Sequence, residues 1–440
     1  MGLRLLFFCL FFFNQAEAAR LGLVVGGVAK SYGTIGALPT DHEFGYAVAR
    51  NARGLEESGY EVTTLFDSVG MNFESSKDTD SFLPGVARAK KLQENMKFQH
   101  DYIKNELKGK PATVNNFEKP FEDLIAKAKP NDEVVVDLFM HGHLFCNGKQ
   151  VGIKPSVKSN HQDGCEYKFG LLNPETGDYD YITGSILTNK IKKLNDTGAK
   201  INLNLQSCHS GAIQQDLSGL KNVCAFFASS ANNVAWGCFP SDPPGDLSYT
   251  SVGDQISYHY YKDHIEKLKQ DPFFKKDSCM DKIRDYAEAN KTQGSSFYEI
   301  FWNSRLHDRM PEEPSISSLV QNPLFTMGHF AATINSLEEI CVREMEVEIE
   351  NSLQLLSGIQ KNNLSLLLKE MKAKIDIYNK NILDQKQAIK DRNNEAIIKL
   401  QRETEEVARN VIQQERILVN ELNNSGRITT SPDDPCKRKI

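Results

Sequence analysis

The sequence predicts an α/β fold with a mostly parallel sheet flanked by helices, followed by a long α-helical C-terminal arm. Three observations predict it. Apolar runs of strand length alternate with amphipathic runs of helical period over residues 20–302. One apolar run, Glu133–Met140, is nearly continuous, as in a strand that is covered on both faces. After Pro323 no proline occurs until Pro432, and the residues between are rich in Glu, Lys, Gln, Asn and Leu.

Residues 1–19 predict a secretory signal peptide. A basic residue precedes the apolar run Leu5–Phe13, and Ala16–Ala18 has the small-x-small pattern of a signal peptidase site. The apolar run is too short to span a bilayer, and no later run is long enough to be a stable membrane anchor. A buried first helix is the alternative. With cleavage after residue 18 or 19, we expect a secreted or luminal protein, in an endolysosomal or extracellular location.

Charge and cysteine content indicate which classes of partner to expect and whether disulfides can form. The chain has 52 basic and 58 acidic residues, so we expect neither nucleic acid nor an anionic membrane surface as a partner. Of the nine cysteines, Cys9 leaves with the signal peptide, and an oxidising compartment permits disulfides among the other eight. Cys146 and Cys165 flank one short insertion and form the preferred pair. The remaining pairings cannot be derived from the sequence.

The first part of the mature chain has the pattern of a β-α-β unit. Leu21–Gly27 is an apolar run that predicts a buried strand, and apolar residues then recur at helical spacing over 44–58. Gly59 ends that helix, and Tyr60–Phe66 predicts a second strand. Such a unit implies parallel strands that are joined by a right-handed crossover.

The middle of the chain predicts the central strands of the sheet. Helical patterns over 84–108 and 117–128 precede the strand Glu133–Met140. Residues 146–182 keep no sustained period and predict an irregular insertion. The remaining elements follow in chain order: a helix over 186–194, an alternating strand over 201–206, a strand over 223–229, and helices over 250–270 and 279–290.

Composition then sets the other boundaries, which are a linker over 303–332, a helical region over 333–422 and a disordered tail over 423–440. Apolar residues of the helical region step by threes and fours, with a register slip beyond Arg392. This spacing predicts long helices, either as a hairpin or as a coiled coil with a stutter. A plain helical bundle packed on the first domain is an equal alternative. Self-association and autoinhibition are both open as roles. The residues in register are Leu364, Leu368, Met371, Ile375, Tyr378, Ile382 and Ile389.

Two of the predicted strands end in reactive side chains. His141-Gly142 follows one, and Ser207-Cys208 follows the next parallel strand. A thiol needs a base to act as a nucleophile near neutral pH, and an attacked amide needs main-chain donors for its oxyanion. A lone cysteine is more often a buried apolar residue, but the two strand ends together favour a Cys–His pair.

These strand ends resemble the catalytic dyad of the caspase-like cysteine peptidases, the group of caspases, metacaspases and legumains. The sequence Cys208-His-Ser-Gly211 is similar to metacaspases, with a close variant in legumains. Asn51 to Leu65 resembles the first crossover of the same fold, and Ser230 to Phe239 resembles a legumain loop at one wall of the pocket for the P1 residue, the one before the scissile bond. The resemblance covers residues 20 to 300 and leaves the helical arm unexplained.

The resemblance implies a secreted or luminal cysteine endopeptidase. His141 would be the general base and acid, Cys208 the nucleophile, and the N–H groups of Gly142 and Cys208 the oxyanion donors. His143 and His209 compete for the role of base, and His141 is preferred. A transamidase or peptide ligase that uses the same dyad is the near alternative. A catalytically silent scaffold with a helical interaction arm is the alternative from another class.

The expected substrate is a peptide or protein, and its P1 side chain is where this chain departs from its relatives. Metacaspases and legumains have an acidic residue two positions before the cysteine, whereas Gln206 is neutral. We therefore expect an Asn-preferring or small-polar-preferring pocket, unless Asp163, Asp178 or Asp180 supplies a carboxylate. The residues expected to bind substrate are Gln206, Ser229, Ser230 and Trp236.

No metal and no cofactor is expected. His141, His143 and Cys146 would not converge on zinc from one strand without a fourth ligand, which the sequence does not identify. The glycines near the start of the mature chain lack the pattern of a phosphate-binding loop.

Overall fold

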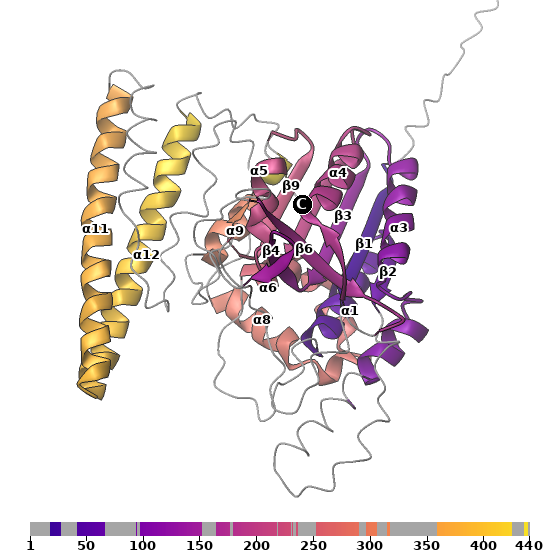
Figure 1. Ribbon diagram of the computed structural model, residues 1–440, viewed down its shortest axis with the longest axis horizontal. Coiled ribbons are helices and arrows are strands. Elements are labelled where there is room, and N and C mark those ends of the chain that lie inside the picture. The colour runs from indigo at the N-terminus through magenta and orange to yellow at the C-terminus, as the bar shows by residue number, and fades with distance from the viewer. Residues whose placement is uncertain are drawn as a thin grey trace, which may run out of the picture.

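The protein is described by a computed structural model (Figure 1). The described residues are 18–27, 42–66, 94, 97–151, 164–176, 179–217, 219–229, 231, 235, 252–289, 296–305, 315–316, 359–424 and 435–438. The predicted signal peptide before residue 18, most of the linker and the first part of the predicted helical region lie outside these residues.

A sheet of six strands organises the first domain, in the order β10-β9-β8-β3-β1-β2. The pairs from β9 to β2 are parallel, and only β10 runs antiparallel, against β9. This confirms the predicted α/β fold. The strands are β1 (Arg20–Gly27), β2 (Glu61–Phe66), β3 (Glu133–Met140), β8 (Lys200–Gln206), β9 (Val223–Phe227) and β10 (Ser315–Ile316).

Helices cover both faces of this sheet (Figure 1), and buried apolar side chains of the central strand β3 leave both of its faces. One face packs against α1 (His42–Glu57), α6 (Val252–Tyr261), α8 (Ser278–Ala289) and α9 (Phe297–Arg305). The other face packs against α3 (Val114–Lys127), α4 (Gly184–Asn195) and α5 (Gln214–Leu217). Short turns of helix also occur in this domain, at η4 (Ser210–Ile213), η5 (Lys262–His264), α7 (Ile265–Leu268) and η6 (Phe274–Lys276).

The central strand β3 carries one buried acidic residue. Asp137 is completely buried, and the Asn51 side chain donates a hydrogen bond of 3.0 Å to its Oδ2 atom. Burial raises the pKa of Asp137 to about 7, although hydrogen bonds from neighbouring side chains oppose that shift. A carboxyl group in the middle of the core therefore holds its proton into the neutral range.

The predicted irregular insertion is instead a second sheet, so that prediction was wrong. Its four antiparallel strands have the order β5-β4-β6-β7. They are β4 (Gly142–Cys146), β5 (Lys149–Val151), β6 (Cys165–Leu172) and β7 (Tyr179–Thr183). Three of these strands have five residues or fewer, too few for a period of two to be recognised.

A disulfide closes the second sheet where the sequence placed one. Cys146 and Cys165 are bonded and lie opposite each other in the register of β4 and β6. This confirms the preferred pair. The bond ties together the two ends of a segment of which residues 152–163 lie outside the described part of the chain.

The C-terminal arm contains two long helices, α11 (Ile359–Lys390) and α12 (Asn394–Asn424), which form a hairpin (Figure 1). Gln385 occupies the position at which the apolar spacing of α11 skips a step. It is buried, and its side-chain amide donates to Thr404 Oγ1 over 2.6 Å and to the Leu400 carbonyl over 3.2 Å. A polar layer between the helices therefore replaces the missing apolar contact. The buried apolar residues along the seam are Met371, Ile375, Tyr378, Ile382, Ala408 and Val411.

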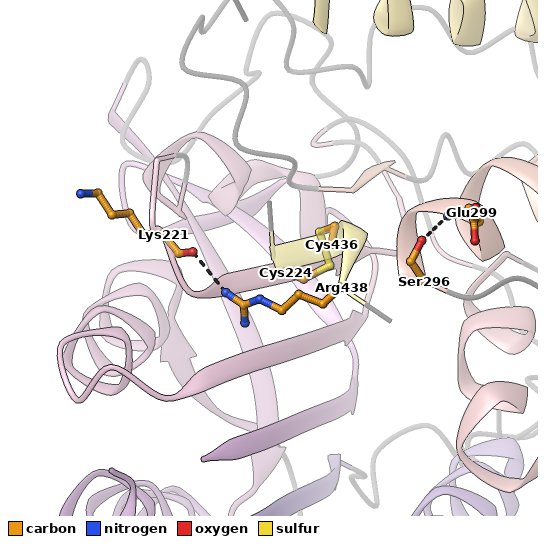
Figure 2. The surroundings of a disulfide bond; sticks show 6 residues. All are labelled: Lys221, Cys224, Ser296, Glu299, Cys436 and Arg438. Atoms are coloured by element: carbon orange, nitrogen blue, oxygen red, sulfur yellow. Dashed lines mark hydrogen bonds between the residues drawn. A yellow bond between two sulfur atoms is a disulfide. The ribbon is translucent and has the colours of Figure 1, made fainter. Parts of the chain in front are cut away.

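The predicted disordered tail over 423–440 contains a fixed segment, which corrects the prediction. Pro435–Lys437 form the 3-10 turn η9, and Cys436 is completely buried. Figure 2 shows its disulfide with Cys224 of β9, beside which the Arg438 guanidinium donates to the Lys221 carbonyl. The covalent bond fixes this short polar segment, which has too few apolar residues to fold by burial alone.

Candidate active site

The two reactive strand ends lie side by side. Strands β3 and β8 are adjacent and parallel, with Val136 opposite Leu203 and Phe139 opposite Gln206. Parallel neighbours end at the same edge of a sheet, so the residues that follow them, His141 and Cys208, share that edge. The prediction that both belong to one site depends on this pairing.

Gly142 is the point at which the two strand ends touch. A Cβ atom on this residue would lie 1.8 Å from the Cys208 carbonyl oxygen and 2.6 Å from Ser207 Oγ. No other residue type fits, because the backbone of the turn that carries the thiol occupies the space of the side chain. The histidine-bearing strand end therefore packs directly against the cysteine-bearing one.

Cys208 is half-buried and, of the described cysteines, is the one that remains a thiol. The Ala235 N–H donates a hydrogen bond of 3.4 Å to its Sγ atom. A donor aimed at sulfur favours the thiolate over the thiol. The next residue, His209, has a φ of 60° and turns the chain from β8 into η4. The thiol is thus placed at the tip between a strand and a turn of helix.

The position of His209 does not suit the role of general base, because its ring is held by another group. Its Nδ1 atom donates to the Ala231 carbonyl over 2.9 Å, and the Tyr167 hydroxyl donates to the same oxygen over 2.8 Å. Burial lowers the pKa of His209, although the bond to Ala231 opposes that change. Its imidazole therefore fastens the turn to the neighbouring loop.

His143 is also a poor candidate for the base. It is 8% exposed, and the side-chain amide of Gln150 lies 2.9 Å from its Nδ1 atom. Burial lowers the pKa of His143 to about 4, and the nearby imidazoles of His141 and His209 add to the shift. A ring that stays neutral in this way accepts a proton poorly. His141 is half-buried and lies between β3 and β4, in contact with the rings of Phe44 and Tyr179.

Residues 168–280 match the model of the Peptidase C13 family. This is the legumain family, which belongs to the caspase-like clan. The match runs from β6 into α8 and includes Cys208, but it begins after His141. No curated protein matches the chain. At the level of the family, the match indicates a cysteine-type peptidase or transamidase. It supports the legumain side of the resemblance and does not extend to metacaspases.

Within the stretch that matches Peptidase C13, Gln206 is held by α6. Its side-chain amide donates to Ser257 Oγ over 2.6 Å and to the Gly253 carbonyl over 3.4 Å. The sequence did not identify Ser257, because a serine inside a predicted helix has no pattern that separates it from an ordinary surface residue. The neutral residue two positions before Cys208 is therefore fixed in place by the helix that covers β8.

Ser229 differs from the expectation that it lines the pocket. It is completely buried, and its hydroxyl donates to the Ser207 carbonyl over 3.1 Å. Its own carbonyl accepts from the Gly211 N–H over 2.8 Å. Ser229 thus braces the backbone on both sides of Cys208. Ser230 and Trp236, the other two residues expected to bind substrate, lie outside the described residues.

The sequence also suggested carboxylates for the P1 pocket and side chains for a zinc site, and the structure describes some of them. Asp180 of β7 accepts a hydrogen bond of 3.1 Å from the Asn173 side chain, while Asp163 and Asp178 lie outside the described residues. Cys146 is in a disulfide, so it is not a ligand beside His141 and His143. In the described part of the chain, no three His, Cys, Asp or Glu side chains are arranged to hold a metal ion.

Proposed function

We propose that the protein is a cysteine endopeptidase that cleaves peptide bonds through an acyl-enzyme at Cys208. The observation that carries this proposal is the contact of Gly142 with the Cys208 carbonyl, because it joins the histidine-bearing and cysteine-bearing strand ends. The family match over residues 168–280 supports it independently.

In the proposed reaction, His141 takes the proton of the Cys208 thiol, and Sγ attacks the carbonyl carbon of the substrate. The N–H groups of Gly142 and Cys208 are assigned as donors to the oxyanion that forms. His141 then gives its proton to the leaving amine as the C–N bond breaks. Water, deprotonated by His141, hydrolyses the thioester, releases the acyl product as an acid and restores the thiol.

A transamidase or ligase is the second candidate, because the Peptidase C13 match indicates either activity at the level of the family. The two reactions share the acyl-enzyme and differ in whether water or an amine attacks it. For the P1 residue we propose asparagine or another small polar side chain. Gln206 brings no charge to compensate a buried ammonium or guanidinium group.

The test is cleavage of a peptide library by the mature chain, beside Cys208→Ala and His141→Ala, with products identified by mass spectrometry. We expect each substitution to lower kcat/KM by a factor of about 10³ or more. His264→Ala is the matched control, since this histidine lies in η5 and pairs with Ser58 on another part of the domain. Turnover that survives Cys208→Ala would end the assignment.

Added amine nucleophiles separate the two activities within the same assay. A ligase gives amide products in proportion to the amine concentration, whereas a strict peptidase gives the free acid alone. An intact chain without turnover and without labelling by a thiol-directed peptide probe would favour a silent scaffold.

We also propose that the protein is secreted or luminal and that the helical hairpin covers the active site or mediates self-association. The N-terminal pattern and the disulfide bonds Cys146–Cys165 and Cys224–Cys436 support the location, because oxidised cysteines persist in such compartments. No helix among the described residues is long and apolar enough to cross a membrane. Exposed apolar side chains on the hairpin support a contact surface; they are Leu366, Ile377, Leu383, Ile389 and Ile398.

A further inference from the structure

A cavity of about 560 Å³ lies at the edge of the six-stranded sheet that is opposite the active site. Arg20, Glu133 and Lys200 line it, and they are the first residues of β1, β3 and β8. His141 and Cys208 follow the other ends of β3 and β8. A strand rises about 3.3 Å per residue, so β3 keeps the two places roughly 26 Å apart. We call this separate space the basal cavity.

The C-terminal segment closes one side of the basal cavity. Pro435 and Arg438 belong to the lining, and Cys436 between them is bonded to Cys224 of β9 (Figure 2). Helix α6, the turn η5 and helix α9 supply further lining residues. The cavity is therefore built from elements that are far apart in the sequence, and one of its walls is held by a disulfide.

The lining of the basal cavity is positively charged, in a chain whose net charge is -6. Four basic side chains line it, against two acidic ones. Arg20 and Glu133 compensate each other, since their Nε and Oε2 atoms lie 3.2 Å apart. Basic groups remain in excess among the other charged residues of the lining, which are Lys200, Lys262, Asp263 and Arg438.

Lys200 and Lys262 carry this excess. Both are half-buried, and neither side chain forms an ion pair or a hydrogen bond within the described part of the chain. Burial lowers the pKa of His259 to about 3, and the Lys262 ammonium adds to that shift, so this histidine contributes no charge to the lining. Two ammonium groups that are partly withdrawn from water favour an anion between them.

Aromatic rings give the basal cavity an apolar wall. The ring centroid of His259 lies 5.6 Å from that of Phe297 and 6.0 Å from that of Tyr260. Phe297 and Tyr260 are almost completely buried and lie 6.1 Å from each other. The volume falls in the range of small-molecule sites, which combine an apolar wall with a few polar groups. A bare oxyanion would leave these rings without a contact.

We propose that the basal cavity binds a small phosphate monoester whose organic part is aromatic or apolar. The phosphoryl group carries nearly two negative charges at neutral pH, which matches the two lysines without ion pairs. Lysine binds phosphate oxygens as a point charge, so Lys200 and Lys262 hold the phosphoryl group. The organic part packs against Phe297 and Tyr260. The site goes beyond the proposed peptidase function, because it lies at the other edge of the sheet.

The test is isothermal titration calorimetry of the intact mature chain at pH 7.5, with phenyl phosphate as the probe. We expect saturable binding of one equivalent. Phenyl sulfate carries a single negative charge, and inorganic phosphate lacks the ring, so each should bind about tenfold more weakly. Phenol, which has no charge, should show no saturable binding.

Substitutions locate the binding. We expect Lys200→Gln and Lys262→Gln each to lower the affinity for phenyl phosphate by a factor of about ten, because each removes a charge-assisted hydrogen bond. The double variant Lys200→Arg, Lys262→Arg preserves both charges and should retain saturable binding. Lys193→Gln is the matched control: this exposed lysine of α4 also has no ion pair within the described part of the chain, and it lies outside the lining. Thermal unfolding without ligand checks that each variant is folded.

The proposal is overturned if the unsubstituted chain shows no saturable binding of phenyl phosphate, or if neither glutamine substitution changes the affinity. Equal affinities for phenyl phosphate and phenol would also overturn it. Tighter binding of a peptide that contains phosphotyrosine would contradict the assignment to a small molecule and indicate a phosphorylated protein instead. No peptide bond is cleaved in these measurements, so the outcome is independent of the peptidase assignment.

Discussion

Gly142 has no side chain, and this lets the ends of strands β3 and β8 pack against each other. The Cys208 carbonyl occupies the position of its missing Cβ atom, so the chemistry of the site depends on a backbone contact as much as on the thiol and the imidazole. Ser229 and His209 act in the same way from the other side, because their hydrogen bonds fix the turn around Cys208. A close backbone contact and buried hydrogen bonds thus set the geometry around the thiol.

We expect Gly142→Ala to lower kcat/KM by a factor of about 10² or more, because the added methyl group pushes the turn of Cys208 out of position. Overpacking of this kind costs about 1–3 kcal/mol of stability. Gly148→Ala is the matched control in the same sheet, since a Cβ there meets nothing within 4 Å and only its φ of 78° is unfavourable. Peptide turnover and urea unfolding measure both effects. Equal activity losses in the two variants would contradict the steric explanation.

Asp137 predicts how stability depends on pH. The unfolded chain releases this proton near the ordinary pKa of 3.8, whereas the folded chain keeps it up to about 7. Between these values the folded state binds more protons, so the free energy of unfolding falls as the pH rises, by at most about 1.4 kcal/mol per pH unit. Asp137→Asn lacks this titration. We expect the difference in unfolding free energy, unmodified chain minus Asp137→Asn, to decrease from pH 4 to pH 7 in urea titrations. A constant difference over that range would contradict the assignment.

At the scale of elements, strong patterns were predicted and short ones were not. The run Glu133–Met140 was identified residue for residue, because a central parallel strand is apolar on both faces. The second sheet was missed, since β4, β5 and β7 are short. The part of the site that lies at the ends of β3 and β8 followed from the sequence. The hydrogen bond from Gln206 to Ser257 did not, because it joins two elements that are distant in the sequence.

The second sheet also predicts a link between a disulfide and catalysis. Replacing both Cys146 and Cys165 by Ala opens a closed segment with a sequence separation of 19. A loss of about 3 kcal/mol in stability is expected from the loop length. Because β6 holds the His141 carbonyl through Gly170, we expect peptide turnover to fall as well. Thermal unfolding and kcat/KM measure the two effects, while the bond between Cys224 and Cys436 remains intact as the internal control. Unchanged turnover in a destabilised variant would contradict the idea that the second sheet positions His141.

At the scale of the whole molecule, the described residues form an α/β domain, a helical hairpin and a short terminal segment that returns to the domain. The sequence predicted the first two, from strand-length apolar runs and from helical spacing. The pairing of Cys224 with Cys436 was not predictable, because a separation of 212 residues leaves no local pattern. The hairpin lies between these two cysteines in the chain.

The consequence is a closed covalent circuit. The backbone from Cys224 through the linker, both arm helices and the terminal turn returns to its starting strand by a sulfur–sulfur bond. With a protease site inserted in the linker between residues 317 and 332, we expect one cut to yield two fragments that migrate together without reductant and apart with it. Cys279 is disulfide-bonded as well, so the test uses Cys279→Ser together with Cys436→Ser. The fragments of this double variant should separate in both conditions on a denaturing gel, whereas those of Cys279→Ser alone should separate only with reductant. Separation of the unsubstituted chain without reductant would contradict the circuit. A single cleavage in the linker therefore leaves the helical hairpin bonded to the domain through Cys224 and Cys436. Its release requires a second cleavage or reduction of the disulfide.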